Sequence, residues 1–285
     1  MTPAADRDLV VDPLRPLRDR VSVVTGASRG IGAATAHALV AAGARVVLAA
    51  RDQARLDEVA EAINAAAGAG TARVVPTDVT DAGAVAVLIG RTVEEFGRLA
   101  IAVNNAAGGG HPPTPRGEQH RRGRAPTHPL AEVAVAEFDA AIAATLRSVF
   151  LGMKYAIPAM LAGGGGTIVN MGSTAGLQAV AGLVGYATSK HGLVGLTRIA
   201  ALDYAEQGIR VNALAPGPIH THHLERAGEH GRAMAARAMP MRRVGQVDEV
   251  AAAVVWLCSD DASFITARCY PSTAASSPAT RPSNR

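Results

Sequence analysis

The segment Val21-Ser22-Val23-Val24-Thr25-Gly26-Ala27-Ser28-Arg29-Gly30-Ile31-Gly32 decides the fold of this chain. Its β-branched start followed by a turn signal predicts a short buried strand. The glycines then lead into an alanine-rich helical pattern that reaches about Ala42. Strand, glycine turn and helix in this order are the context of a dinucleotide-binding loop, because glycines allow phosphate oxygens close to the backbone and a helix N-terminus attracts negative charge. The spacing is G-x-x-x-G-x-G, not the commoner G-x-G-x-x-G.

The rest of the chain repeats this alternation of short β-branched runs and longer helical patterns. Strands are expected near residues 20–25, 45–50, 72–77, 99–104, 166–172 and 209–215. Helices are expected near 30–42, 53–67, 81–96, 134–161, 184–207 and 247–259. Such alternation favours a parallel sheet with helices on both faces. The sequence therefore predicts an α/β fold, a single Rossmann-type domain with a doubly wound parallel sheet over residues 19–271, between a flexible leader (1–18) and a disordered tail (272–285).

Composition restricts the class of protein further. The 285 residues are 48% hydrophobic but only 3% aromatic, so the core must be built from Ala, Val, Leu and Ile. The two cysteines, Cys258 and Cys269, form neither a disulfide framework nor a zinc pattern, which is typical of a reducing cytosol. No apolar run approaches the length of a membrane span, and the first residues lack the order of a signal peptide. We therefore expect a cytoplasmic protein without membrane partners, and a net charge of +4 does not argue for nucleic acid.

Ligands of doubly wound sheets bind beyond the carboxyl ends of the strands. The polar and glycine-rich motifs of this chain follow the expected strands, so they should meet at one edge. They are Gly26–Gly32, Arg51, Asp78, 104–108, Ser173 and 216–221.

Tyr186 and Lys190 lie four residues apart and should share a helix face. A nearby ammonium group favours the ionised form of a phenol, so such a tyrosine can exchange a proton near neutral pH. An ordinary amphipathic helix would carry the same pair, and the pair gains meaning only beside a nucleotide site.

Together these motifs resemble the short-chain dehydrogenase/reductase family. The likeness extends from about Asp19 to Thr266 and includes the order of the glycine turn, Asn104-Asn105-Ala106, Ser173, Tyr186, Lys190 and Pro216-Gly217. The resemblance implies hydride transfer between a nicotinamide and a carbonyl carbon, with Tyr186 as general acid or base. It also implies that Lys190 lowers the pKa of Tyr186 and holds the nicotinamide ribose, and that Ser173 hydrogen-bonds the carbonyl oxygen. Structural alternatives are a turn role for Ser173 and a solvated Lys190.

The second expected strand ends without the acidic residue that binds the ribose hydroxyls of NAD. Arg51 follows it instead, and Arg51 and Arg29 suit the 2′-phosphate of NADP through charge-assisted hydrogen bonds. Arg51 could also be a solvated residue that opens the next helix, and Asp78 a residue before a helix N-cap. By resemblance, the cofactor-binding residues are Gly26, Ser28, Arg29, Gly30, Ile31, Gly32, Arg51, Asp78, Val79, Asn105, Ala106, Tyr186, Lys190, Pro216, Gly217, Ile219 and Thr221.

The chain departs from the family at four places. Thr145 stands where the family carries an asparagine of its proton relay, so Thr145 is a catalytic candidate and the relay is weakened or rerouted. Ala107 replaces a glycine after Ala106. A Pro-, Arg- and His-rich insertion over 108–129 is expected to be a mobile, solvated loop, with contact to an acidic substrate or carrier as the alternative. The family's C-terminal Asp-Gly-Gly element is missing, which puts the implied homodimer or homotetramer in question.

Residues 216–245 are expected to form a lid over the substrate. Its methionines suit a mid-sized hydrophobic carbonyl compound, and its histidines lack the spacing of metal ligands, so no metal is expected. The sequence predicts an NADP-dependent oxidoreductase for a ketone or secondary alcohol, such as a 3-oxoacyl or secondary-metabolite ketoreductase or a sugar or steroid dehydrogenase. The alternatives are a catalytically weak nucleotide-binding protein with a regulatory or scaffolding role and, less favoured, nucleic-acid binding.

Overall fold

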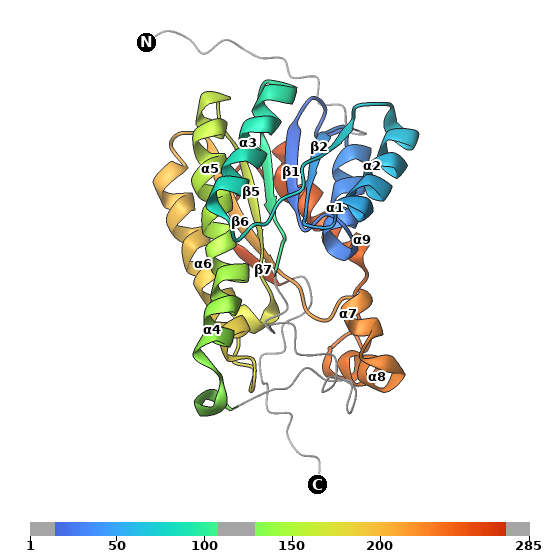
Figure 1. Ribbon diagram of the computed structural model, residues 1–285, viewed down its shortest axis with the longest axis vertical. Coiled ribbons are helices and arrows are strands. Elements are labelled where there is room, and N and C mark those ends of the chain that lie inside the picture. Colours follow the sequence, from blue (N-terminus) through green and yellow to red (C-terminus); the bar gives the residue numbers. More distant parts are fainter. Residues whose placement is uncertain (1–14, 108–128, 272–285) are drawn as a thin grey trace.

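The computed structural model describes residues 15–107 and 129–271, so the predicted insertion, tail and most of the leader fall outside the described residues, and Pro129 alone of the insertion is described. Its strands are β1 (Val21–Thr25), β2 (Arg45–Ala49), β3 (Ala72–Val74), β4 (Ile101–Asn104), β5 (Gly166–Met171), β6 (Ile209–Ala215) and β7 (Cys269–Pro271). They form one parallel sheet in the order β3-β2-β1-β4-β5-β6-β7. This topology confirms the predicted doubly wound α/β fold (Figure 1).

The helices cover both faces of the sheet. They are α1 (Gly30–Ala41), α2 (Gln53–Ala67), α3 (Ala82–Phe96), α4 (Val135–Ala141), α5 (Ser148–Ala162), α6 (Val184–Tyr204), α7 (His222–Glu225), α8 (Gly228–Ala238) and α9 (Val247–Cys258), with short 3-10 turns η1 (Leu130–Glu132), η3 (Thr174–Gly176) and η4 (Asp260–Ala262) and a π-helical segment η2 (Ile142–Arg147). Helices α1, α2 and α9 lie on one face, and α3, α5 and α6 lie on the other (Figure 1).

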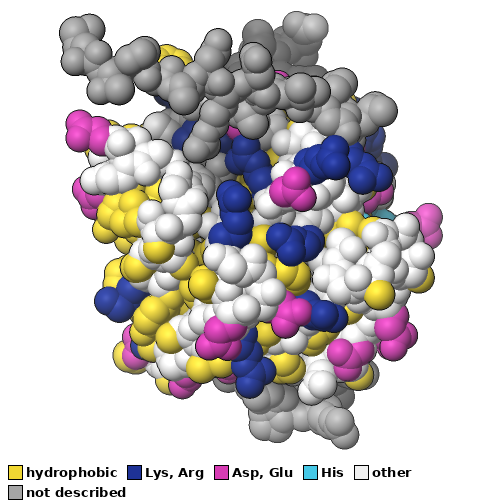
Figure 2. Space-filling model, turned by 90° about the horizontal axis from the view of Figure 1, so that it is seen from above, with side chains coloured by type: hydrophobic (Ala, Val, Ile, Leu, Met, Phe, Trp, Pro, Cys, Tyr) yellow, Lys and Arg dark blue, Asp and Glu magenta, His cyan; other side chains and the backbone are white. Residues whose placement is uncertain are grey.

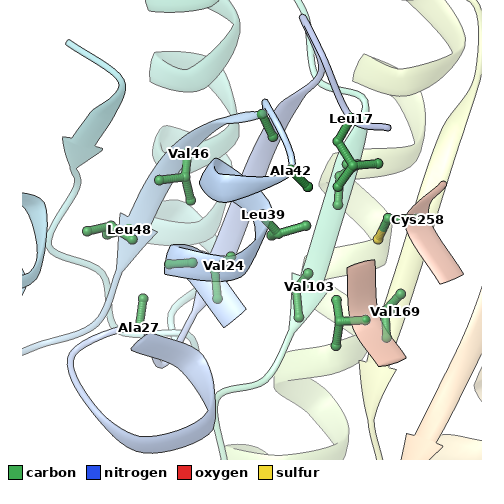
Figure 3. Close-up of a cluster of buried hydrophobic side chains, with 14 of the residues drawn as sticks. Leu17, Val24, Ala27, Leu39, Ala42, Val46, Leu48, Val103, Val169 and Cys258 are labelled. Atoms are coloured by element: carbon green, nitrogen blue, oxygen red, sulfur yellow. The ribbon is translucent and has the colours of Figure 1, made fainter. Parts of the chain in front are cut away.

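Two apolar clusters fill the space between the sheet and its helices, because successive strand residues point to opposite faces. Val24, Val46 and Leu48 point to the α1 and α9 side, where they pack with Leu39 and Cys258 (Figure 3). Their neighbours along the strands belong to the second cluster, against α3, α5 and α6. Burial on both faces explains why the strands are continuously apolar.

The structure differs from the predicted elements in several places. The helix expected over 134–161 is divided by η2, and β3 ends at Val74, although the N–H groups of Val75 and Thr77 still donate to the carbonyls of Leu48 and Ala50. Strand β7 and the helices α7 and α8 were not predicted. In the predicted leader, Leu17 is fully buried and its N–H bonds to the Ala42 carbonyl at 2.9 Å, so packing begins before residue 19.

One helical stretch, Val135–Ala162, is long and apolar enough to cross a membrane by length and composition, contrary to the expectation that no such run exists. Half of its most apolar window is buried inside the molecule. Its α5 part packs against β4, β5 and α3, so its apolar character is that of a helix covering a sheet.

Candidate active site

The glycine turn between β1 and α1 is fixed to the end of β4. The side-chain amide of Asn105 donates to the carbonyls of Thr25 (2.9 Å) and Gly26 (3.3 Å), and the Thr25 hydroxyl accepts the N–H groups of Asn105 and Ala106. Gly26 and Gly30 adopt φ values of +67° and +57°, which favour glycine. A Cβ on Gly32 would lie 2.2 Å from the Gly26 oxygen, so the turn closes only with glycine there.

Helix α1 begins at this turn without a side-chain cap. Arg29 occupies the N-cap position, and its side chain makes no capping hydrogen bond. Helices α2 and α3, in contrast, are capped by Asp52 and Asp81. The first N–H groups of α1 therefore lie at the carboxyl edge of the sheet without a side-chain acceptor, and the helix dipole there favours an anion.

The predicted ribose and adenine contacts separate into two groups. Arg51 is exposed after β2 and acts electrostatically on Asp78 after β3. Asp78 accepts hydrogen bonds from the N–H and hydroxyl of Thr80 (2.9 and 2.8 Å), which are the main reason that its pKa is lowered. Val79 follows it, half-buried. The charge of Arg29 instead helps to lower the pKa of His223. Arg29 and Arg51 therefore have different electrostatic partners among the described residues.

Helix α6 positions Tyr186 and Lys190 on one side, as expected from their spacing. The Lys190 ammonium nitrogen lies 5.6 Å from the centroid of the Tyr186 ring. Its hydrogen bond goes to the carbonyl oxygen of Met171 at the end of β5, at 2.6 Å. Lys190 is only 2% exposed, and this burial lowers its pKa from 10.5 to about 8.

The electrostatics of Tyr186 differ from the expectation. Burial raises the pKa of its phenol, and a side-chain hydrogen bond with Ser173 acts in the opposite direction. Burial is the larger of the two effects, so the pKa of the phenol is raised where a lowering by Lys190 was expected. Tyr186 is therefore protonated at neutral pH. Ser173 itself is held as the N-cap of η3, where its hydroxyl accepts the N–H of Ala175 at 3.1 Å.

Thr145 lies inside the π-helical segment η2, which packs against α6. Its side chain is fully buried, and its hydroxyl has no hydrogen-bond partner among the residues that the structure describes. A buried hydroxyl without a partner is costly, so this atom is a place for a bound water or another polar group.

The segment after β6 closes the site from the other side. The Pro216 carbonyl accepts the N–H of Thr174 at 3.0 Å, which joins the ends of β5 and β6. Gly217 follows, half-buried, and Ile219 is buried in the core. A Cβ on Gly30 would lie 3.5 Å from the Thr221 methyl group, so the segment after β6 contacts the glycine turn.

The remaining predicted residues of the glycine turn, Ser28 and Ile31, are half-buried beside it. His222, one of the histidines in 216–245 from which no metal site was expected, has its ring 3.9 Å from that of His223, and its Nε2 has no partner among the described residues. Burial is the main cause of the lowered pKa of His222. In the described part of the chain, no three His, Cys, Asp or Glu side chains gather to hold a metal ion.

Sequence reasoning missed a buried polar chain behind the site. The Asn104 amide donates to the Asn170 side-chain oxygen at 2.8 Å, and the Asn170 amide donates to the Thr197 hydroxyl at 3.0 Å. These bonds join β4, β5 and α6. An asparagine inside the apolar run 167–171 is the signal that could have identified this chain of bonds.

Comparison with known proteins identifies the family and the fold of this chain. A sequence profile of the family described as enoyl-(acyl carrier protein) reductase matches residues 26–271. Cis-4-hydroxycyclohexanecarboxylate dehydrogenase of Sinomonas cyclohexanicum is 40% identical over 248 residues, covering 87% of this chain and 92% of that protein. 2,5-Dichloro-2,5-cyclohexadiene-1,4-diol dehydrogenase of Sphingobium indicum is 39% identical over 257 residues, covering 89% and 95%.

The levodione reductase of Leifsonia aquatica is 34% identical over 267 residues, covering 91% of this chain and 94% of that protein. A crystal structure of levodione reductase matches with a TM-score of 0.82 at 34% identity, covering 92% of this chain and 99% of the other. The chain thus belongs to the short-chain dehydrogenase/reductase family, whose members are NAD(P)-dependent oxidoreductases that act on alcohols and ketones.

Proposed function

We propose that this enzyme interconverts a ketone and a secondary alcohol with NADP(H), with Tyr186 as general acid or base. The observation that carries the proposal is the position of the buried Lys190, whose ammonium nitrogen lies 5.6 Å from the centroid of the Tyr186 ring, with Ser173 acting on the same phenol. A donor, a polarising hydroxyl and a fixed cation are the groups that carbonyl reduction needs around one oxygen atom.

The raised pKa of Tyr186 makes its phenol the proton donor in ketone reduction. A protonated phenol donates its proton to the oxygen of a ketone, and Ser173 donates a hydrogen bond to the same oxygen as charge develops on it. Tyr186 then carries the negative charge, and the ammonium of Lys190, 5.6 Å from the ring centroid, stabilises the phenolate. In alcohol oxidation the same groups act in reverse, with the phenolate as base.

The glycine turn fits the phosphates of a dinucleotide, because the uncapped start of α1 and its glycines offer N–H groups without steric obstruction. Asp78 and Val79 would contact the adenine, and Asn105 and Ala106 border the glycine turn. The residues that would contact the nicotinamide end are Pro216, Gly217, Ile219 and Thr221. When bound, the nicotinamide supplies or accepts the hydride. Lys190 would hold its ribose, and Thr145 would hold a water that passes protons toward Lys190.

NADP rather than NAD is proposed from the residues after β2. Arg51 is exposed, and no acidic residue ends the strand. Arg29 lies in the glycine turn itself, at the N-cap of α1. Arg51→Ala should raise the Michaelis constant for NADPH far more than that for NADH. Arg55→Ala is the matched control, since Arg55 lies on α2 and pairs with Asp52 at 3.2 Å. Equal effects of Arg51→Ala on both cofactors would refute the assignment.

We propose an alicyclic compound with a six-membered ring as the substrate. Two relatives are named for a hydroxycyclohexanecarboxylate and a cyclohexadiene diol, and they align over most of this chain. The lid also carries Met234 and Met241, both exposed, which suit an apolar ring. Cyclohexanone and substituted cyclohexanones should therefore be reduced faster than a 3-oxoacyl thioester, a sugar or a steroid, and the opposite order would reject this substrate class.

The activity itself is tested with purified protein, NADPH and this panel of ketones. Loss of NADPH absorbance is expected, and Tyr186→Phe should reduce the rate by about a thousandfold because it removes the proton donor. Tyr204→Phe, at the other end of the same helix, is the control and should retain activity. Tight NADPH binding without turnover on the whole panel would favour the catalytically weak nucleotide-binding alternative.

A further inference from the structure

A cavity lies at the end of the molecule opposite the candidate active site. Its volume is about 1140 Å³, and it is lined by the residues that precede β1, β4, β5 and β6. It therefore opens at the amino-terminal edge of the sheet, whereas the candidate catalytic residues lie at or near the carboxyl edge. None of its described lining residues belongs to the candidate active site. The two sites are separated by the length of the strands.

The cavity is strongly cationic. Six arginines line it, from different segments of the chain: Arg15, Arg18, Arg20, Arg98, Arg210 and Arg268. Two aspartates face them. Asp260 is bound by Arg20 at 2.5 Å, and Asp19 lies 3.9 Å from Arg18. Figure 2 views the molecule from this end and shows basic side chains gathered near the middle of the face.

Four of these arginines have no carboxylate partner within residues 15–107 and 129–271: Arg15, Arg98, Arg210 and Arg268. Like charges around one cavity repel each other, and an anion that enters the cavity relieves this repulsion. The positive charge is a property of the cavity, since the whole chain carries a net charge of only +4.

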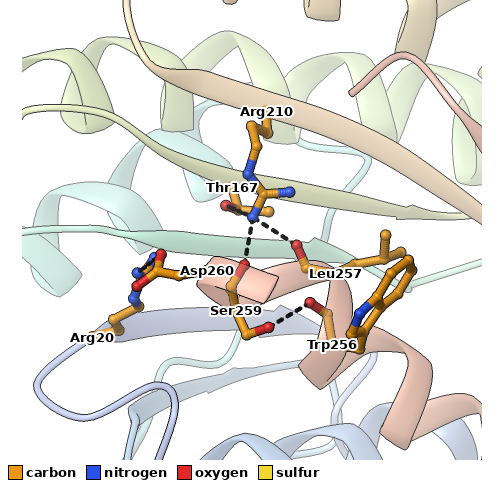
Figure 4. Close-up of polar contacts among 7 residues, drawn as sticks. All are labelled: Arg20, Thr167, Arg210, Trp256, Leu257, Ser259 and Asp260. Atoms are coloured by element: carbon orange, nitrogen blue, oxygen red, sulfur yellow. Dashed lines mark hydrogen bonds and ion pairs between the residues drawn. The ribbon is translucent and has the colours of Figure 1, made fainter. Parts of the chain in front are cut away.

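Arg210 lines the cavity and is held in place by several hydrogen bonds, of which Figure 4 draws those to Thr167, Leu257 and Ser259. Its guanidinium donates to the Thr167 hydroxyl at 3.0 Å and to the carbonyls of Leu257 (2.8 Å), Ser259 (3.2 Å) and Ile265 (3.2 Å). These partners are neutral, so they hold the half-buried guanidinium in place without cancelling its charge. A cation that is already immobilised loses little side-chain entropy when it binds an anion.

One part of the cavity lining consists of glycines and has no side chains. Residues 163–166 are four consecutive glycines, and a Cβ on Gly165 would lie 2.6 Å from the carbonyl oxygen of Gly208. Gly164 faces open space, with no atom within 4 Å of a built Cβ. The side chain of Phe264 lines the cavity and is fully exposed. A chain of linked anionic groups can thus reach several arginines at once.

We propose that this cavity binds a polyphosphate chain, either inorganic or as part of a nucleotide. Guanidinium groups match phosphate oxygens with paired hydrogen bonds, and several arginines around one cavity suit a ligand with several phosphates better than one with a single charge. An aromatic side chain at the cavity is able to stack on a base. The site is independent of the proposed catalytic function, because it shares no residue with it.

The test is calorimetric titration of the full chain with tripolyphosphate, and separately with UTP, at about 0.15 M salt, where long-range attraction between exposed charges is screened. Saturable binding with one ligand per chain is expected. The double variant Arg98→Gln, Arg268→Gln should weaken binding at least about tenfold, since each arginine loses a charge-assisted contact. Both side chains are exposed, so the variant should fold.

Arg29→Gln is the matched control, because Arg29 lies at the glycine turn, where phosphates could also bind. It should leave tripolyphosphate binding unchanged. Tighter binding of UTP than of tripolyphosphate, lost in Phe264→Ala, assigns the site to a nucleotide; equal binding assigns it to inorganic polyphosphate. The proposal is overturned by absence of saturable binding, by binding that the double variant leaves intact, or by binding that Arg29→Gln removes.

Discussion

Replacement of Lys190 by methionine should abolish the part of the rise in the free energy of unfolding with pH that comes from this buried lysine. Burial lowers the pKa of Lys190 from 10.5 to about 8. The unfolded chain, with the ordinary pKa, therefore binds more protons between about pH 8 and 10.5, so the free energy of unfolding rises with pH through this window. Below pH 8 the buried ammonium destabilises the fold, and this cost disappears as the pH approaches 10.5. A shift of this size corresponds to about 3 kcal/mol.

The measurement is urea unfolding of the wild type and of Lys190→Met between pH 7 and 10, followed by fluorescence of Trp256, the single tryptophan. The difference between the two free energies of unfolding should move in favour of the wild type by about 2 kcal/mol or more over this range, most of the expected linkage. Subtracting the variant removes the contribution of other titrating groups, provided that they respond alike in both proteins.

The chain offers an unusually clean control, because it contains only two lysines. Lys154 is exposed on α5, and Lys154→Met should follow the wild type at every pH. Lysine labelled with ¹³C and ¹⁵N should likewise give two side-chain signals by NMR, of which one titrates near pH 8. A difference between wild type and Lys190→Met that stays constant with pH, or two signals that both titrate above pH 10, would refute the argument from burial.

Three further predictions concern the site and its support. Thr145→Asn should leave ketone reduction unchanged or raise it, because the longer amide can make the hydrogen bonds that the buried threonine hydroxyl lacks; a severe loss in a turnover assay would reveal a specific role for the hydroxyl. Gly32→Ala should raise the dissociation constant for NADPH at least about tenfold in a fluorescence titration, since the glycine turn must deform; unchanged affinity would contradict this. Gly152→Ala should destabilise the fold by about 1–3 kcal/mol in urea unfolding, because its Cβ would lie 2.1 Å from Asn104, whereas Gly90→Ala, which meets open space, should not; equal effects would count against the packing argument.

The parts of the fold that follow from local pattern could be predicted from sequence. The β-branched run before Gly26 and the regular alternation after it determine the parallel sheet, and the same order brings the motifs after each strand to one edge. Spacing on α6 likewise places Tyr186 and Lys190 on one side. These inferences need only periodicity and the rule that parallel strands end together.

The features that sequence reasoning missed depend on tertiary packing. Strand β7 is three residues long and forms only beside β6. The direction of the pKa shift of Tyr186 depends on how deeply its phenol is buried, which no pattern gives. The cationic cavity joins Arg15 to Arg268, which are distant in sequence.

The segment between β6 and α9 is joined to itself near its two ends. Ile219 and Gly245 form a bridge, with hydrogen bonds from the His220 N–H to the Gly245 carbonyl (2.8 Å) and from the Gly245 N–H to the Pro218 carbonyl (3.0 Å). The 25 or so residues between them thus form a loop whose two ends are held together by hydrogen bonds. Such a segment can be exchanged as a unit. Replacing residues 220–244 with the corresponding segment of a relative should change which substrates the enzyme accepts, while the sheet and its covering helices keep their structure.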